Sequence, residues 1–121
     1  AEKVFIDATL SLTDVNWVNW NYIEKFAPFG LGNPKPTFCF NKVVLADVRY
    51  FGKEKTHLEL SFEQTDVKAI LFFAKGSNEE HGKYGVLKAG DTVDLVATIE
   101  LNTFRNTREL RLRIVSITQK R

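Results

Sequence analysis

Aromatic and basic side chains occur together in two short segments of the 121-residue chain. The first segment, 49–57, reads Arg-Tyr-Phe-Gly-Lys-Glu-Lys-Thr-His, and the second, 104–113, contains four arginines. Rings can stack on unpaired bases while cations contact phosphates, so this combination predicts binding of a single-stranded nucleic acid. The candidate binding residues in the two segments are Arg49, Tyr50, Phe51, Lys53, Lys55, His57, Phe104, Arg105, Arg108, Arg111 and Arg113.

Two further candidates, Lys68 and Phe72, lie in a segment whose alternation is ambiguous. If Lys68 faces outward on a strand, Phe72 shares its face and can stack on a base. The alternate residues from Val67 to Phe73 would form an equally apolar face, so the orientation stays open at this stage.

Charge is concentrated near the C-terminal end of the chain. Residues 102–121 carry six basic residues and one acidic residue, whereas the whole chain has a net charge of only +2. A basic strand face is also typical of ordinary solvation, and Glu54, Glu59 and Glu63 would oppose a polyanion. Pattern and composition alone therefore leave nucleic-acid binding and a plain solvated surface both open.

Catalytic and metal-binding motifs are missing from the sequence. His57 and His81 have no second His or Cys at metal-ligand spacing, and Glu79-Glu80-His81 is expected to be a solvated loop tip. Cys39 stands between two phenylalanines and is expected to be a small core or semi-buried residue and not a nucleophile. Neither a phosphate-binding loop nor a nucleophile elbow is present. We therefore expect this chain to have no catalytic residue, no metal and no cofactor.

The cellular setting follows from two simple features. One cysteine cannot form an internal disulfide, which suits a reducing cytoplasm. No apolar run approaches the ~20 residues that a membrane span needs.

The spacing of hydrophobic residues changes near Thr37. Residues 1–27 are expected to form a short extended segment and then a helix that Thr13 or Asp14 caps and Pro28 stops. Its Trp- and Tyr-rich face is expected to meet another domain. Residues 28–36 form a connector whose prolines fix φ and whose glycines supply unusual dihedral angles. The structural residues of this connector are Pro28, Phe29, Gly30, Gly32, Asn33, Pro34 and Pro36.

Residues 37–121 alternate with the period of two that is typical of strands. Five strands are expected, with a longer loop, 75–88, between the third and the fourth. This layout predicts a mainly β, five-stranded OB-fold, a Greek-key barrel whose first and fourth hairpin loops commonly bind oligonucleotides. An SH3-like barrel or a plain meander is the competing interpretation.

The connector carries a more specific signal. The stretch 27–38 resembles the P-F-G-x-G-N-P-x-P-x-F signature of the RecJ family of bacterial single-strand-specific DNA exonucleases. The segments 6–12, 87–93 and 109–114 resemble the same family, so the resemblance extends over essentially the whole chain. The resemblance implies an OB module that follows a catalytic core in a longer bacterial, cytoplasmic enzyme of DNA recombination and repair.

The resemblance also implies partners. They are single-stranded DNA, degraded from its 5′ end by the parent, the catalytic domains of the same parent chain, and manganese or magnesium bound in that core. This sequence has no Asp-His pair of the kind that the family's catalytic core uses, so the chain itself is expected to grip DNA. The alternative is a docking module for an acidic protein, such as the tail of a single-strand-binding protein. A free-standing nuclease on an OB-like barrel is a third, weaker interpretation.

Overall fold

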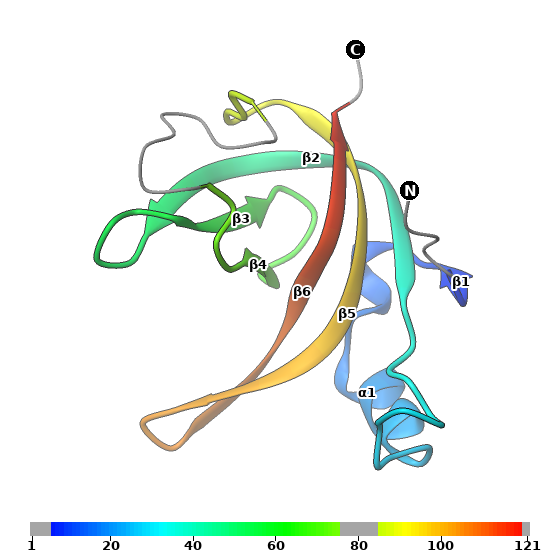
Figure 1. The fold of residues 1–121 in the computed structure, drawn as a ribbon. Coiled ribbons are helices and arrows are strands. Elements are labelled where there is room, and N and C mark those ends of the chain that lie inside the picture. The colour runs from blue at the N-terminus through cyan, green and yellow to red at the C-terminus, as the bar shows by residue number, and fades with distance from the viewer. Residues whose placement is uncertain (1–5, 76–84, 120–121) are drawn as a thin grey trace.

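Five strands close into a barrel in the computed structural model, which describes residues 6–75 and 85–119. β2 pairs with β3 on one side and with β5 on the other, so the order β2-β3-β4-β6-β5 returns to β2 (Figure 1). β4 runs parallel to β6, and the other barrel pairs are antiparallel. This is the predicted OB-fold. The strands are β2 (Phe38–Phe51), β3 (His57–Phe62), β4 (Lys68–Leu71), β5 (Thr92–Phe104) and β6 (Thr107–Gln119).

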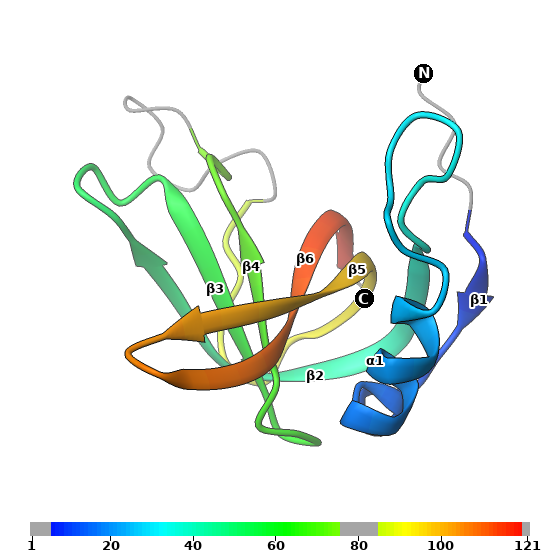
Figure 2. The same cartoon turned by 90° about the horizontal axis from the view of Figure 1, so that it is seen from below.

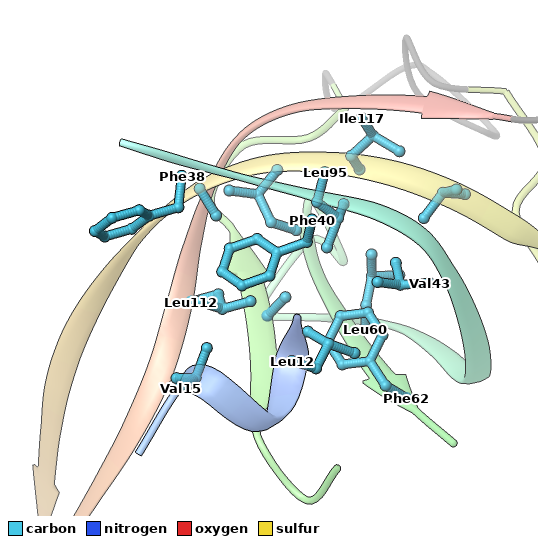
Figure 3. Packing of buried hydrophobic residues seen from close by; sticks show 14 of the residues in the cluster. Leu12, Val15, Phe38, Phe40, Val43, Leu60, Phe62, Leu95, Leu112 and Ile117 are labelled. Atoms are coloured by element: carbon cyan, nitrogen blue, oxygen red, sulfur yellow. The ribbon is translucent and has the colours of Figure 1, made fainter. Parts of the chain in front are cut away.

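The barrel interior is filled by the alternating apolar residues of these strands. Burial alternates strictly along β3 and over the first nine residues of β5, as the period of two requires. Phe40, Leu60, Leu95 and Leu112 have no exposed surface and meet in the centre of the core (Figure 3). Burying each such side chain contributes roughly 1.5–3 kcal/mol to folding.

β2 is long because it pairs with two neighbouring strands, one after the other. Its first half pairs with β5 and its second half with β3, and the register shifts once within each pairing. Such bulges bend a strand and increase its twist. This bend brings the C-terminal end of β2, with Arg49 and Phe51, to the edge of the face formed by β3 and β4.

The N-terminal segment covers one end of the barrel. β1 (Ala8–Thr9) pairs in parallel with the start of β2, and the 3-10 turn η1 (Leu12–Asp14) and α1 (Trp17–Glu24) follow it. Figure 2 shows α1 beside the barrel. Leu12 and Val15 point into the core beneath Phe40 (Figure 3).

The prediction of one continuous helix capped by Thr13 or Asp14 was wrong in detail. Ser11 and Asp14 form a capping box around η1, and the Asn16 side chain accepts a hydrogen bond from the N–H of Asn19 at the start of α1. α1 ends at Glu24, before Pro28. The break turns Leu12, Val15 and Trp20 to the core and leaves Trp17, Val18, Tyr22 and Phe26 exposed. That this exposed face meets another domain remains a prediction.

Asn33 holds the connector in shape. Its side-chain amide donates to the carbonyls of Phe26 (2.6 Å) and Pro28 (2.9 Å), and its backbone pairs with Gly30 in both directions. The expected role of the glycines was wrong, because neither Gly30 nor Gly32 has a positive φ and an added Cβ would meet nothing within 4 Å. The connector therefore depends on an amide cross-link more than on glycine dihedrals.

The third strand is shorter than predicted. β4 ends at Leu71, and Phe72 and Phe73 lie in the turn that follows. Most of the predicted loop 75–88, with His81 and its neighbouring glutamates, falls outside the described residues. No helix in the described part of the chain is long and apolar enough to span a membrane.

Candidate nucleic-acid interface

Cross-strand register brings the predicted site residues onto the outer face of the barrel. Arg49 on β2 lies opposite Glu59 on β3, Glu59 opposite Ile70 on β4, and Ile70 opposite Arg113 on β6. Directly paired residues project from the same side of a sheet, so these four side chains form one row across the barrel. The next row contains Lys68 opposite Arg111.

Four rings gather at one end of this face, and we call them the aromatic cluster: Phe51, His57, Phe72 and Phe73. The His57 ring is central, with centroids 5.3 Å from Phe51, 5.1 Å from Phe72 and 4.7 Å from Phe73. Its Nδ1 accepts a hydrogen bond of 3.0 Å from the backbone N–H of Phe73, so the neutral ring carries its proton on Nε2.

The hairpin turn between β2 and β3 is shaped around His57. Gly52 has a φ of +93°, and a Cβ there would lie 2.6 Å from Cδ2 of His57. Glycine is required at this position both for its backbone conformation and for the close approach of the imidazole.

Arginines lie over the aromatic cluster from two different strands. The guanidinium of Arg49 is 5.1 Å from the Phe51 ring centroid, and that of Arg113 is 4.6 Å from the Phe72 ring centroid. Both distances are within the range of a cation–π contact. Each guanidinium lies over its ring, so cations and aromatic rings are packed together at this end of the face.

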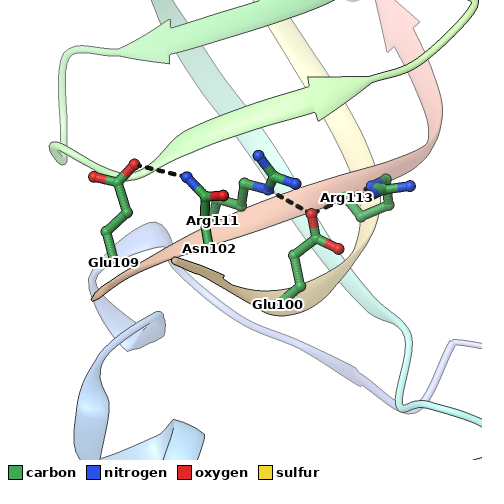
Figure 4. A network of polar contacts seen from close by, with 5 residues as sticks. All are labelled: Glu100, Asn102, Glu109, Arg111 and Arg113. Carbon is green, nitrogen blue, oxygen red and sulfur yellow. Dashed lines mark hydrogen bonds and ion pairs between the residues drawn. The ribbon is translucent and has the colours of Figure 1, made fainter. Parts of the chain in front are cut away.

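Carboxylates neutralise part of this positive charge. Glu100 on β5 accepts hydrogen bonds through one oxygen from Arg111 and Arg113, and Glu59 pairs with Arg49 at 3.1 Å (Figure 4 shows the Glu100 network). Glu100 is the most buried of these charged side chains, with 13% of its surface exposed. The strand arginines are thus fixed in place and partly neutralised.

Basic residues in the two hairpin loops differ from the strand arginines. Lys53 and Lys55, between β2 and β3, are exposed and have no ion pair within the described residues. Arg105, at the tip between β5 and β6, lies 5.1 Å from the Phe104 ring, which is 64% exposed. Among the predicted site residues that the structure describes, the positive charge without a carboxylate partner therefore lies at the two loops, at Arg108 near the start of β6 and at Lys68 on β4.

Several of the predicted residues lie away from the aromatic cluster: Lys68 and Arg111 in the neighbouring row, Tyr50, and Phe104, Arg105 and Arg108 at the β5–β6 hairpin. Tyr50 lies opposite the buried Leu58 and packs against the core, so it projects from the other side of β2 than Phe51. Lys68 faces outward, where its ammonium bonds to Ser61, and Phe72 joins the cluster from the turn beyond β4.

Two residues of this face were missed by the sequence analysis. Phe73 is the most exposed ring of the aromatic cluster, at 78%, because a positive φ in the turn after β4 directs it outward. Glu100 belongs to an alternating strand and resembles any other solvated glutamate until β6 is placed beside it. A strand end, such as the end of β4 that places Phe73 in a turn, can be predicted from sequence. The ion pair between β5 and β6 cannot, because no local signal indicates it.

The described residues offer no set of three His, Cys, Asp or Glu side chains that could hold a metal ion. Burial, and secondarily Asp94, raise the pKa of the Cys39 thiol. A raised pKa keeps the thiol protonated at neutral pH, which does not favour nucleophilic chemistry.

Comparison with known families agrees with this fold. The family model described as the RecJ OB domain matches residues 6–116. The chain belongs to the RecJ OB domain family. Among curated proteins, this RecJ OB domain is similar to the single-stranded-DNA-specific exonuclease RecJ of Bacillus subtilis (strain 168), with 26% identity over 90% of the chain. It spans only 13% of that relative's length.

Solved structures show the same fold. RecJ from Thermus thermophilus, crystallised with Mg2+, is similar over 85% of the RecJ OB domain and 14% of its own chain, with a TM-score of 0.61 and 16% identity. A putative aspartyl-tRNA synthetase from Leishmania major Friedlin is similar over 92% of this chain and 20% of its own, with a TM-score of 0.53 and 12% identity.

Proposed function

We propose that this RecJ OB domain binds single-stranded DNA across the outer face of β2, β3, β4 and β6 and holds it for a nuclease core elsewhere in the parent protein. The observation that carries the proposal is the aromatic cluster, flanked by Arg49 and Arg113 and adjoining a basic hairpin loop. OB-folds commonly bind oligonucleotides on this face and at these loops.

The aromatic cluster favours single strands because only unpaired bases can expose a ring face. Phe73 offers the largest accessible ring surface, and Phe51 and Phe72 lie half-buried beside it. Each base stacked on such a ring contributes about 1–3 kcal/mol. Stacking accepts every base, so we expect little sequence preference.

Phosphate contacts should come mainly from the loops. Lys53, Lys55 and Arg105 are free of carboxylates in the described part of the chain, whereas Arg49, Arg111 and Arg113 are paired. The paired arginines supply less net charge, and the domain should therefore bind moderately and release easily. Moderate affinity with easy release suits a DNA strand that must move through an enzyme.

The parent protein is proposed to be a metal-dependent exonuclease. The resemblance to the RecJ family implies that its catalytic core would bind manganese or magnesium. The proposal is supported by the family match and by the similarity to a single-stranded-DNA-specific exonuclease. The family match does not favour docking of an acidic protein as the main role.

Fluorescence anisotropy tests the proposal. A labelled single strand of ~20 nucleotides and a duplex of equal length are titrated with the 121-residue chain at low and moderate salt. We expect preferential binding of the single strand, with a plot of log K against log[salt] whose slope is about −2 if three phosphates are neutralised. Absence of binding at low salt, or equal binding of the duplex, would contradict the proposal.

A further inference from the structure

A second, separate aromatic surface lies between α1 and the start of β6. There an open cleft of about 330 Å3 has an apolar floor formed by Val15, Trp17, Val67 and Leu110. Its volume is at the lower end of the range for small-molecule sites, roughly 300–1,000 Å3. The cleft is therefore large enough for one planar heterocycle.

Trp17 is the side chain that offers an aromatic ring for stacking in this cleft. It is the first residue of α1, and 42% of its surface is exposed, whereas Trp20, one turn later, is 7% exposed and belongs to the core. The guanidinium of Arg108 lies 5.5 Å from the Trp17 ring centroid. The guanidinium lies over the ring, so a base would stack on the part of the indole that stays exposed, as bases stack on aromatic side chains of single-strand-binding proteins.

Arg108 differs from the strand arginines of the outer face. Arg111 and Arg113 share Glu100, but Arg108 has no carboxylate partner among the described residues. Its guanidinium contacts the Trp17 ring, and that contact leaves its hydrogen-bonding edges available. Because Arg108 has no carboxylate partner among the described residues, its guanidinium can bind a phosphate oxygen without breaking an ion pair.

The acidic residues of the cleft decide which part of a nucleotide enters it. Asp66 and Glu109 line the cleft, and Glu109 already accepts a hydrogen bond from Asn102. Carboxylates repel a phosphate but accept hydrogen bonds from the amino groups of a base. A base is therefore expected inside the cleft, with its phosphate outside, next to Arg108.

We propose that this cleft binds one nucleobase of the single strand, stacked on Trp17, with Arg108 contacting the adjacent phosphate. Arg108 lies three residues before Arg111 on β6 and therefore projects from the other side of the strand. Asp66, Glu109 and Leu110 nevertheless line both this cleft and the hollow beside Lys68 and Arg111, so the cleft adjoins the proposed interface. The proposal rests on the proposed function and adds a base subsite, carried by the N-terminal segment, to it.

The chain's two tryptophans allow a direct test, because stacking of a base quenches indole fluorescence and Trp20 is buried. Unlabelled oligothymidylate is titrated into the chain while tryptophan emission is recorded, and the same samples are followed by anisotropy with a labelled strand. We expect quenching that saturates together with binding. Trp17→Phe should lose the quenching, and Trp20→Phe should keep it.

Affinity provides the second readout. Trp17→Ala should weaken binding by about 5- to 150-fold, the range for loss of one stacked base. Arg108→Ala should reduce the steepness of the salt dependence by about 0.7, the value for one phosphate on a single strand. Val18→Ala is the matched control, since Val18 is the next residue of α1 and is 78% exposed.

The outcomes separate this inference from the proposed function. Binding without quenching, together with unchanged affinity of Trp17→Ala, would overturn the base subsite and leave the outer-face interface standing. Absence of any single-strand binding would overturn both proposals.

Discussion

Glu100 and Arg111 form an ion pair across β5 and β6, on the same face as the aromatic cluster, and the same carboxylate oxygen also reaches Arg113 at 3.3 Å. One negative charge thus holds two guanidiniums that would otherwise be free to bind phosphates. Because the carboxylate is only 13% exposed, water screens it less than an ordinary surface glutamate. This relationship predicts that Glu100 limits the affinity of the face for DNA.

Replacing Glu100 with Gln should raise affinity for single-stranded DNA by about fivefold, since one unit charge at ~4 Å is worth about 1 kcal/mol in water. The salt dependence should become steeper as the two arginines take up phosphates. Anisotropy titrations at several salt concentrations measure both effects. Glu24→Gln, an exposed change of equal charge at the end of α1, should leave both unchanged. A loss of affinity at unchanged stability would mean that Glu100 positions the arginines instead of competing with DNA.

Replacing Phe73 with Ala should cost about 1–3 kcal/mol of DNA binding, because the ring is the most exposed member of the aromatic cluster. The melting temperature should change little, since the ring is 78% exposed. Phe26→Ala removes another exposed ring, one that lies just after α1 and outside the outer face. Equal binding by these two variants would exclude Phe73 as a stacking platform.

Gly52 and Gly90 offer a matched pair of substitutions. Both have a φ of +93°, but an added Cβ meets His57 at Gly52 and nothing within 4 Å at Gly90. Each alanine variant should lose about 1–2 kcal/mol of folding stability from the left-handed backbone. Only Gly52→Ala should also weaken DNA binding, because it displaces His57 from the centre of the aromatic cluster. Thermal unfolding and anisotropy separate the two effects, and parallel loss of binding in both variants would contradict the role of His57.

Asn33 should matter for the connector and not for the DNA-binding face. Asn33→Ala removes both amide hydrogen bonds to the Phe26 and Pro28 carbonyls, which should cost about 1–2 kcal/mol. We expect faster limited proteolysis within residues 28–36 and unchanged DNA affinity. Leu31→Ala, at a fully exposed position of the same turn, is the control and should leave the cleavage rate unchanged. Equal cleavage of both variants would show that the amide cross-link does not hold the connector.

The sequence alone predicted a five-stranded OB-fold, although its alternation left an SH3-like barrel and a plain meander open. Period-two alternation is a local property, and it predicted strands within residues 37–121; Leu58, Leu60, Leu95 and Ala97 are fully buried on those strands. The two basic and aromatic hairpin loops were also predictable, because turn residues and charges are read directly along the chain. The connector residues were recognisable from their types. The predicted need for unusual dihedral angles at Gly30 and Gly32 was wrong, because neither has a positive φ.

Only the tertiary structure decided which of these side chains meet. The pairing of Glu100 with Arg111 and Arg113 depends on the register of β5 against β6, and the contact of Arg108 with Trp17 joins opposite ends of the chain. Phe73 entered the aromatic cluster because β4 ends at Leu71, and Tyr50 was excluded because it lies opposite the buried Leu58 of β3 and so projects from the inner side of β2. Alternation specifies the two sides of a strand, but barrel closure and register, which are set by pairing between distant segments, determine the neighbours on each side.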